Sequence, residues 1–398
     1  MKRSAFVLSA AALPLLPLRA RAGAASVPIP FELLANGIYI PVRVDGQGPF
    51  SFAIDTGSYS SIVAAEFLTQ LGITATGLRR ASGEGSDSSA LATIGRVAFE
   101  LPQQTTVVSE DAASVGLSAL WPLIGRPFYG NLGYDVLKQF VVEIDYANRI
   151  LSLHDPQRYR PSGNGTTYPA TFWNSYGPQI DGTLAVAGRP AIPVKCTLDT
   201  GGGGTIVASP LVDDARLLES VGKTVALPNH GVGNGTSRPL TARLTGLTIG
   251  SYALEAPLVA LSQDRVGSFA SRSLSIDAGG DVLRRFSVTI DYANDRVTLE
   301  PNRYFGMPFE ADASGLVIAA EGNDYRTFVV SEVVPDSAGA RAGIAPGDAI
   351  VTIDSVAAAQ FALWEIEDRL KRSGTIVVLG IRRGTAVLTR QVGLQALI

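Results

Sequence analysis

Short apolar runs, some continuous and some alternating with polar residues, fill most of the chain and are separated by turns rich in Gly, Pro and Asn. Runs of this kind predict β-strands. We expect an apolar strand that ends at Asp55, a short helix over residues 64–71, and hairpins over residues 141–153 and 288–299. The pattern therefore predicts a mainly β fold.

An internal repeat organises this β-rich part of the chain. Three matches define it: Phe52-Ala-Ile-Asp-Thr-Gly57 with Cys196-Thr-Leu-Asp-Thr-Gly201, Asp135-Val-Leu137 with Asp281-Val-Leu283, and Asp145-Tyr-Ala-Asn148 with Asp291-Tyr-Ala-Asn294. Their offsets are 144, 146 and 146 residues, so the matches stay almost in register over the whole unit. Because each copy of a repeat forms one structural unit, we expect two homologous lobes, over residues 27–160 and 161–304.

The pattern changes at about residue 306. Residues 328–354 are arranged as a strand, a short helix, a turn and a second strand, and an amphipathic helix over 361–371 precedes a closing hairpin over 375–392. This order predicts a separate small module over residues 306–398.

The first 22 residues have the pattern of a targeting segment. Lys2 and Arg3 precede an apolar run over residues 5–18, and Ala20-Arg21-Ala22 fits a cleavage site for small residues. This order predicts a secretory signal peptide over residues 1–22 and a periplasmic or secreted location. An uncleaved anchor is the alternative, but the run is shorter than the ~20 residues of a membrane span. We expect no membrane span in the mature chain.

Composition and charge argue against several classes of function. The chain is 46% hydrophobic and 17% charged, which allows a large core. Without residues 1–22 it has 29 basic and 36 acidic residues, a formal net charge of −7, and it has no basic run. Such a chain is not expected to bind nucleic acid. With one cysteine, Cys196, it cannot form an intramolecular disulfide, and its two histidines exclude a histidine metal cluster.

The repeat contains three pairs of acids, and one pair stands out. Asp135 and Asp281 lie where a carboxylate would cap a short helix, and Asp145 and Asp291 lie at turns where Asp commonly bonds to the backbone. Those positions have structural explanations. The Asp55 and Asp199 pair has none, because an acid at the end of a buried strand is costly to bury. We therefore predict that Asp55 and Asp199 are catalytic.

Each of these acids begins an Asp-Thr-Gly turn that could hold the pair together. Gly57 and Gly201 allow a tight turn and a close approach of the opposite loop, and Thr56 and Thr200 offer hydroxyls that could bond across to it. Two carboxylates held about 3 Å apart share one proton, so one can act as base and the other as acid. This is the chemistry that peptide hydrolysis by water requires.

On Asp55-Thr-Gly-Ser58, Asp199-Thr-Gly-Gly202 and Leu132-Gly133, residues 27–304 resemble the retropepsin-like and pepsin-like aspartic proteases, in a bacterial exported form with two lobes in one chain. The resemblance implies a polypeptide substrate, water as nucleophile, and neither metal nor cofactor. It also implies that Ser58 bonds the outer oxygen of the aspartate, a role that Gly202 cannot fill. Flaps over the cleft would lie at residues 81–86 and 229–235.

Residues 306–398 resemble a PDZ domain, on the run Ala340-Arg-Ala-Gly-Ile-Ala-Pro-Gly-Asp348. The resemblance implies binding of a peptide C-terminus or an extended strand. Gly315, Leu316 and Val317 are the candidates for that contact, and a purely structural cap on the protease lobes is the alternative. For the whole chain, two functions stay open: an aspartic endopeptidase, or a catalytically inactive peptide-binding protein on the same scaffold.

Overall fold

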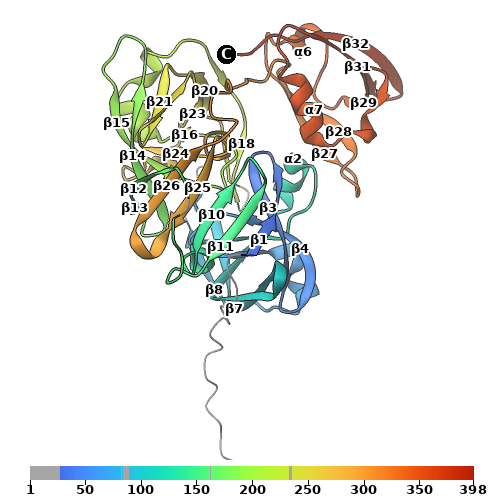
Figure 1. The fold of residues 1–398 in the computed structure, drawn as a ribbon. Coiled ribbons are helices and arrows are strands. Elements are labelled where there is room, and N and C mark those ends of the chain that lie inside the picture. Colours follow the sequence, from blue (N-terminus) through green and yellow to red (C-terminus); the bar gives the residue numbers. More distant parts are fainter. Residues whose placement is uncertain (1–26, 82, 84–88, 162, 233–234) are drawn as a thin grey trace, which may run out of the picture.

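The computed structural model describes residues 27–81, 83, 89–161, 163–232 and 235–398. They form two β lobes followed by a small module (Figure 1), so the predicted mainly β, bilobal architecture is confirmed. The predicted signal peptide lies outside the described residues, as do parts of both predicted flaps. Within the described part of the chain, no helix has the length and apolar character needed to cross a membrane.

Lobe 1 is built on an eight-stranded sheet. In spatial order its strands are β2 (Glu32–Leu34), β3 (Gly37–Val44), β4 (Gln47–Ile54), β9 (Gly130–Leu132), β5 (Ile62–Ala64), β8 (Thr105–Val115), β7 (Ser89–Leu101) and β6 (Gly77–Ala81). The predicted helix over 64–71 is a 3-10 turn (Ala65–Phe67) followed by α1 (Leu68–Leu71). Two further short helices, α2 (Trp121–Ile124) and α3 (Tyr134–Leu137), complete the lobe.

Lobe 2 repeats this plan on a ten-stranded sheet. Its path is β17 (Thr224–Ala226), β20 (Leu240–Arg243), β23 (Leu258–Leu261), β16 (Ile206–Val207), β24 (Ile276–Ala278), β15 (Ile192–Leu198), β14 (Gly177–Ala185), β21 (Gly246–Ile249) and β22 (Tyr252–Glu255), with β13 (Thr171–Trp173) beside β14. Helices α4 (Ser209–Asp214) and α5 (Gly280–Leu283) belong to this lobe. Strands β18 (Asn229–His230) and β19 (Thr236–Ser237) form a separate small hairpin.

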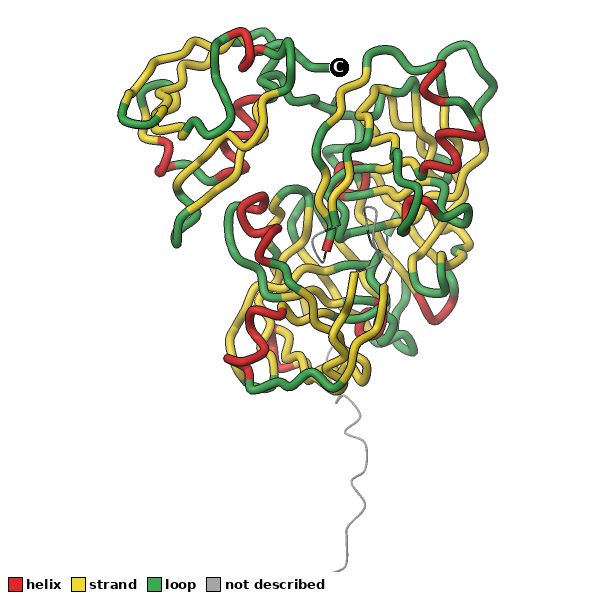
Figure 2. The backbone as a smooth tube through the Cα atoms, turned by 180° about the vertical axis from the view of Figure 1, so that it is seen from behind, coloured by secondary structure: helices red, strands yellow, loops and turns green. Residues whose placement is uncertain are grey.

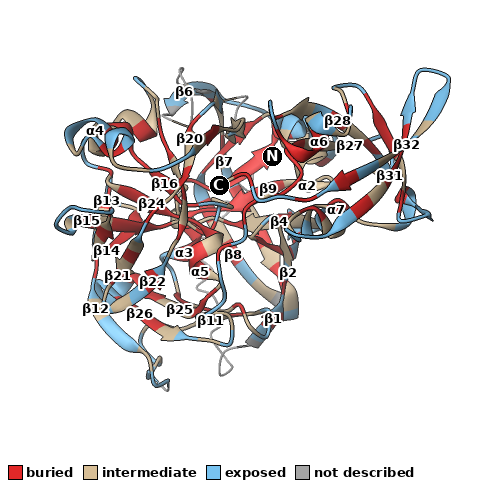
Figure 3. Ribbon diagram, turned by 90° about the horizontal axis from the view of Figure 1, so that it is seen from above, coloured by how far each residue is buried: buried red, intermediate tan, exposed pale blue. Residues whose placement is uncertain are grey.

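A six-stranded sheet joins the lobes, and each lobe supplies three of its strands. The order is β1 (Val27–Pro30), β11 (Ile150–His154), β10 (Val141–Asp145), β25 (Phe286–Asp291), β26 (Arg296–Pro301) and β12 (Thr166–Pro169). The two predicted hairpins are thus β10–β11 and β25–β26, and they pair with each other in antiparallel register, Val141 opposite Asp291. One apolar core runs through both lobes, as the buried residues in Figure 3 show.

The PDZ-like module has a core of its own. Its sheet contains β27 (Leu316–Glu321), β28 (Thr327–Val333), β29 (Ala349–Ile353), β31 (Ile376–Arg383) and β32 (Ala386–Gly393), with β30 (Val356–Ala357) beside β29. Helix α6 (Ala338–Arg341) follows β28, and α7 (Leu363–Leu370) lies within the predicted 361–371 helix. Figure 2 shows this module from behind, next to the two lobes.

A buried arginine anchors the connection between lobe 2 and this module. Arg285 is 1% exposed, and its guanidinium donates to the main-chain carbonyls of Tyr304, Phe305, Met307 and Pro308. It also stacks on the ring of Phe309, 3.6 Å from the ring centroid. Five donors fixed in a plane suit such multiple carbonyl contacts. The connecting segment is therefore attached to lobe 2.

The PDZ-like module also packs on lobe 1. Helix α2 lies against β27, and Gly125, which ends α2 with a φ of 79°, lies against Leu363 at the start of α7. A Cβ atom at Gly125 would be 2.9 Å from the Cβ atom of Leu363. Helix α2 of lobe 1 therefore lies beside both β27 and α7 of the module (Figure 1).

We expect Gly125→Ala to loosen this contact, because the added methyl group meets Leu363 in the folded chain. Gly72→Ala is the matched control: Gly72 also ends a four-residue helix at positive φ, 69°, but a Cβ atom there has no neighbour within 4 Å. Both variants should lose about 1 kcal/mol from backbone strain. Hydrogen exchange should show faster exchange in β27 for Gly125→Ala alone. Equal exchange in both variants would contradict the contact.

Candidate active site

The two predicted catalytic acids lie at equivalent strand ends. Asp55 follows β4 and Asp199 follows β15, and each strand pairs in parallel with a neighbour, β9 or β24. The N–H of Asp55 donates to the carbonyl of Leu132 at 3.0 Å, and the N–H of Asp199 donates to that of Ala278 at 3.0 Å. Each acid thus leaves the core on a strand whose last residues are buried.

The threonines of the two turns connect the lobes by four hydrogen bonds. The Thr56 hydroxyl donates to the carbonyl of Leu198 at 2.6 Å and accepts from the N–H of Thr200 at 3.0 Å. Symmetrically, the Thr200 hydroxyl donates to the carbonyl of Ile54 at 2.7 Å and accepts from the N–H of Thr56 at 3.1 Å. Both threonines are 0% exposed. The expected bonds across the loops are present, and they set the separation of the turns.

The glycines allow the carboxyl groups to approach. A Cβ atom at Gly57 would lie 2.5 Å from Cγ of Asp199, and a Cβ atom at Gly201 would lie 2.5 Å from Cγ of Asp55. Such distances are far below van der Waals contact, so any other residue would push the acids apart. The two carboxyl groups are also close enough for the charge of Asp199 to raise the pKa of Asp55. The structure therefore brings the two predicted acids face to face.

The hydrogen bonds to Asp55 differ from those expected. Its carboxylate accepts from the Gly57 N–H at 3.0 Å and from Nδ2 of Asn131, on β9, at 2.6 Å. The Ser58 hydroxyl donates instead to the carbonyl of Ser60 at 2.9 Å, so the expected bond from Ser58 to the aspartate is not the one formed. Asn131 was missed from the sequence; its place directly before the Leu132-Gly133 motif was the available signal.

Burial and charge disfavour a second negative charge in this pair. Burial is the largest influence that raises the pKa of Asp55, and the charge of Asp199 raises it further. The hydrogen bonds from Asn131 and Gly57 lower the pKa of Asp55, because they stabilise the ionised carboxylate. The raised pKa of Asp55 therefore favours a proton on this side of the pair.

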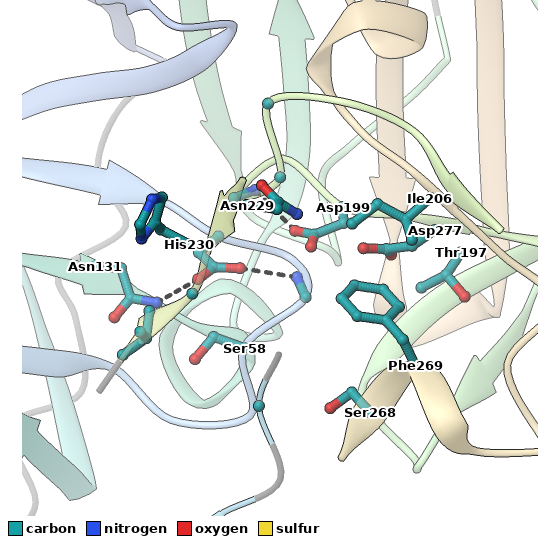
Figure 4. Close-up of a pocket in the computed structure, with 18 of the residues that line it drawn as sticks. Ser58, Asn131, Thr197, Asp199, Ile206, Asn229, His230, Ser268, Phe269 and Asp277 are labelled. Atoms are coloured by element: carbon teal, nitrogen blue, oxygen red, sulfur yellow. Dashed lines mark hydrogen bonds between the residues drawn. The ribbon is translucent and has the colours of Figure 1, made fainter. Parts of the chain in front are cut away.

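A cavity of about 730 Å³ opens over the pair. Its walls come from both lobes and include both acids, Arg79 and Arg80 of β6, and the 227–232 segment of lobe 2. Figure 4 shows Asn131 and His230 on one side and Asp199, Asp277 and Phe269 on the other. The predicted flaps at 81–86 and 229–235 lie partly outside the described residues, but Gly83 of the first and residues 229–232 of the second line the cavity. A cavity of this volume can hold several residues of an extended peptide.

The other repeated acids have structural partners. Asp135 accepts from the N–H and hydroxyl of Ser61 at 2.7 and 2.8 Å, and Asp281 accepts from the Thr205 hydroxyl at 2.7 Å. The helices that contain them have glycine N-caps, Gly133 and Gly279, so neither acid is the N-cap residue. Asp281 still accepts from the N–H of Val282 in the first turn of α5 at 2.8 Å, as a capping carboxylate would. Both acids also tie the turn after an Asp-Thr-Gly motif to a short helix.

The third pair behaves as predicted. Asp145 accepts from the N–H of Asn148 at 2.9 Å and from its side-chain amide at 2.6 Å. Asp291 accepts from the N–H of Asn294 at 3.2 Å and from Arg296 at 2.8 Å. These acids stabilise the hairpin turns, and neither lines the cavity described above.

The predicted PDZ contact residues line a second cavity of about 490 Å³, which also reaches Asp55. Gly315, Leu316 and Val317 all face it. The N–H of Gly315 donates to the carboxylate of Asp312, however, and the N–H of Leu316 donates to the hydroxyl of Ser314 at 3.0 Å. A peptide carboxylate would have to displace these internal acceptors to bind the same N–H groups.

Cysteine and histidine offer little for catalysis at this site. Cys196 is fully buried, and burial raises the pKa of its thiol to about 12, which suits a small core residue. His230 is exposed at the rim of the cavity. Among the residues that the structure describes, no three His, Cys, Asp or Glu side chains are grouped so that they could hold a metal ion.

Comparison with known proteins finds two family matches in separate parts of the chain. Residues 40–136 match the family model of the aspartyl protease, and residues 308–382 match that of the PDZ domain. Among solved structures, the aspartic proteinase from Irpex lacteus is 15% identical, with a TM-score of 0.45, over 71% of this chain and 99% of that one.

A photosystem II D1 C-terminal processing protease is 27% identical, with a TM-score of 0.20, over 21% of this chain and 23% of that one. At these levels of similarity, neither structure shows what this chain binds or cleaves. No curated protein matches the chain.

We expect Thr200→Val to destabilise the junction of the lobes. Valine keeps the shape of threonine but leaves the carbonyl of Ile54 and the N–H of Thr56 without their partner. Burying unsatisfied polar groups costs about 1–3 kcal/mol each. Thr200→Ser retains the hydroxyl and should lose much less stability. Denaturant unfolding of the two variants measures the difference, and equal losses would show that the hydroxyl contributes nothing.

Proposed function

We propose that this chain, which carries an aspartyl protease domain and a PDZ domain, is an aspartic endopeptidase. One observation carries the proposal: the carboxyl groups of Asp55 and Asp199 face each other across turns whose glycines leave no room for a side chain. Nothing in a purely structural role explains why two acids should face each other at such a short distance. The large cavity above them supports an extended polypeptide as substrate.

The proposed reaction begins with one proton shared by the two aspartates. The ionised carboxylate takes a proton from a water molecule as its oxygen attacks the carbonyl carbon of the scissile bond. The protonated carboxyl group gives its proton to the carbonyl oxygen, which forms a neutral tetrahedral intermediate. The carbon–nitrogen bond then breaks, the amine leaves with a proton from one aspartate, and the hydroxyl proton returns to the other. The products are a carboxylic acid and an amine.

A peptide-binding protein without turnover is the alternative. Gly202 favours it, because the second turn lacks a side chain at the position next to Asp199, where a Cβ atom would lie 3.3 Å from Oδ2. The PDZ domain would then supply the binding specificity. The contact between the two acids is required for catalysis but not for binding, so it favours the peptidase.

We also propose that the chain acts outside the cytoplasm, in the periplasm or after secretion. The support is the charged, apolar and small-residue pattern of residues 1–22, which has the order of a secretory signal peptide. Those residues lie outside the described part of the chain.

Asp55→Asn and Asp199→Asn should each abolish cleavage of denatured casein between pH 3 and 7. Either change removes one member of the acid and base pair, a loss of at least about a hundredfold in rate. Asp145→Asn is the control: it makes the same change of charge at a hairpin turn and should retain activity. Gel analysis with purified residues 23–398 provides the measurement. Wild-type protein that cleaves at no pH in this range would favour the binder.

The pH profile offers an independent test of the pair. Cleavage should decline as pH rises through the raised pKa, because the shared proton is then lost. Asn131→Leu removes a hydrogen bond that lowers the pKa of Asp55, so this alkaline limb should move to higher pH. Asn148→Leu removes a bond of equal length, 2.6 Å, to Asp145 and should leave the profile unchanged. An unmoved limb in Asn131→Leu would contradict the assignment.

A further inference from the structure

The hairpin of β18 and β19 forms part of the wall of the catalytic cavity. Residues 227–232, which include β18, line this cavity from lobe 2. Figure 4 shows Asn229 of β18 beside Asp199. A polypeptide that filled the cavity would therefore touch this hairpin as well as the two acids. The reaction proposed above assigns no role to the hairpin.

Strands β18 and β19 form a two-stranded sheet of their own. Asn229 lies opposite Ser237, and His230 lies opposite Thr236, in antiparallel register. A two-stranded hairpin is marginally stable at best in water. Contacts between this short hairpin and the rest of the protein must therefore contribute to its position over the cavity.

The PDZ domain supplies one such contact directly after β19. Arg238 forms a two-bond ion pair with Glu332 of β28: Nη1 donates to Oε2 at 2.9 Å, and Nη2 donates to Oε1 at 2.7 Å. Two parallel bonds of this kind fix orientation as well as distance. Glu332 lies opposite Val317 of β27 in the sheet. The ion pair thus connects the second strand of the hairpin to the sheet of the PDZ domain.

The PDZ domain also packs on the segment that leads into β18. Val225 of β17 and Leu227 form an apolar cluster with Val334, which directly follows β28, and with Leu397. Val225, Val334 and Leu397 are 7–8% exposed, so the contact is largely closed to water. Leu227 in turn lines the catalytic cavity. The same end of β28 therefore holds both sides of the hairpin.

We propose that Arg238 and Glu332 are positioning residues for substrate binding: through their ion pair, the PDZ domain holds the hairpin of β18 and β19 in place against a bound polypeptide. This inference rests on the proposed peptidase function. A hairpin released from the pair would have to be ordered again when the substrate binds, which costs free energy. Its contacts with the substrate do not take part in the proton transfers, so the loss should raise KM and leave kcat almost unchanged.

Charge reversal tests the ion pair. Glu332→Arg and Arg238→Glu each place two like charges opposite one another. Since the Arg238 side chain is 54% exposed, we expect a modest effect: KM should rise about fivefold and kcat should stay within about twofold. The double variant, Arg238→Glu with Glu332→Arg, restores opposite charges and should return KM towards the wild-type value. The substrate is an internally quenched peptide taken from a casein cleavage site.

Asp181→Arg is the matched control for Glu332→Arg. It reverses the acid of another exposed ion pair of lobe 2, in which Lys195 lies 2.7 Å from Asp181, and neither residue lines the two cavities. KM should stay at the wild-type value in this variant. A rise equal to that of Glu332→Arg would overturn the inference, because net charge alone would then explain the effect.

A merely structural contact predicts different results. It would lower the stability of the two single variants and leave KM unchanged, which would overturn the inference. A double variant whose KM stays as high as in the single variants would overturn it as well. Hydrogen exchange of residues 229–232 gives an independent measurement: it should be faster in each single variant and slow again in the double variant.

Binding separates this inference from the peptidase proposal. If the wild-type protein cleaves no peptide, the peptidase proposal fails, and the affinity for fluorescein-labelled denatured casein is compared instead. Binding that is about fivefold weaker in Glu332→Arg and recovers in the double variant supports the positioning role without turnover. Unchanged affinity and unchanged hydrogen exchange in the single variants would reject it.

Discussion

The hydrogen bonds between the hydroxyl of each turn threonine and the backbone of the opposite lobe determine the geometry of the whole site. Thr56 and Thr200 each donate to a carbonyl two residues before the other threonine and accept from the opposite N–H group. Four buried bonds in a closed arrangement leave little freedom for the lobes to slide. Asp55 and Asp199, one residue before each threonine, are consequently held face to face.

This arrangement explains several other features of the lobes. Glycine follows each threonine because a Cβ atom would collide with the opposite carboxyl group. The six-stranded sheet continues the same approximate symmetry, since its two central strands, β10 and β25, come from equivalent positions of the repeat. The two lobes differ at one pair of equivalent positions. Asn131 of β9 donates to Asp55, whereas the equivalent residue of β24 is an acid, Asp277.

The PDZ domain lies next to the candidate active site. Its Gly315–Val317 segment lines a cavity that also reaches Asp55, while α2 of lobe 1 packs on β27. Peptide addition at β27 would therefore require α2 to give way, and carboxylate binding would require Asp312 to release the N–H of Gly315. Arg285 keeps the connecting segment on lobe 2.

The sequence by itself predicted two β-rich lobes and singled out Asp55 and Asp199 as the candidate catalytic acids. It could do so because hydrophobic periodicity and an internal repeat can be read along the chain without knowing its fold. It also indicated the threonine bonds and the need for glycine. The partners of Ser58 and Asn131 were decided by tertiary structure alone. Asn131 lies 76 residues from Asp55, and parallel pairing of β4 with β9 brings them together. Contacts across such distances depend on which strands become neighbours, which no local pattern records.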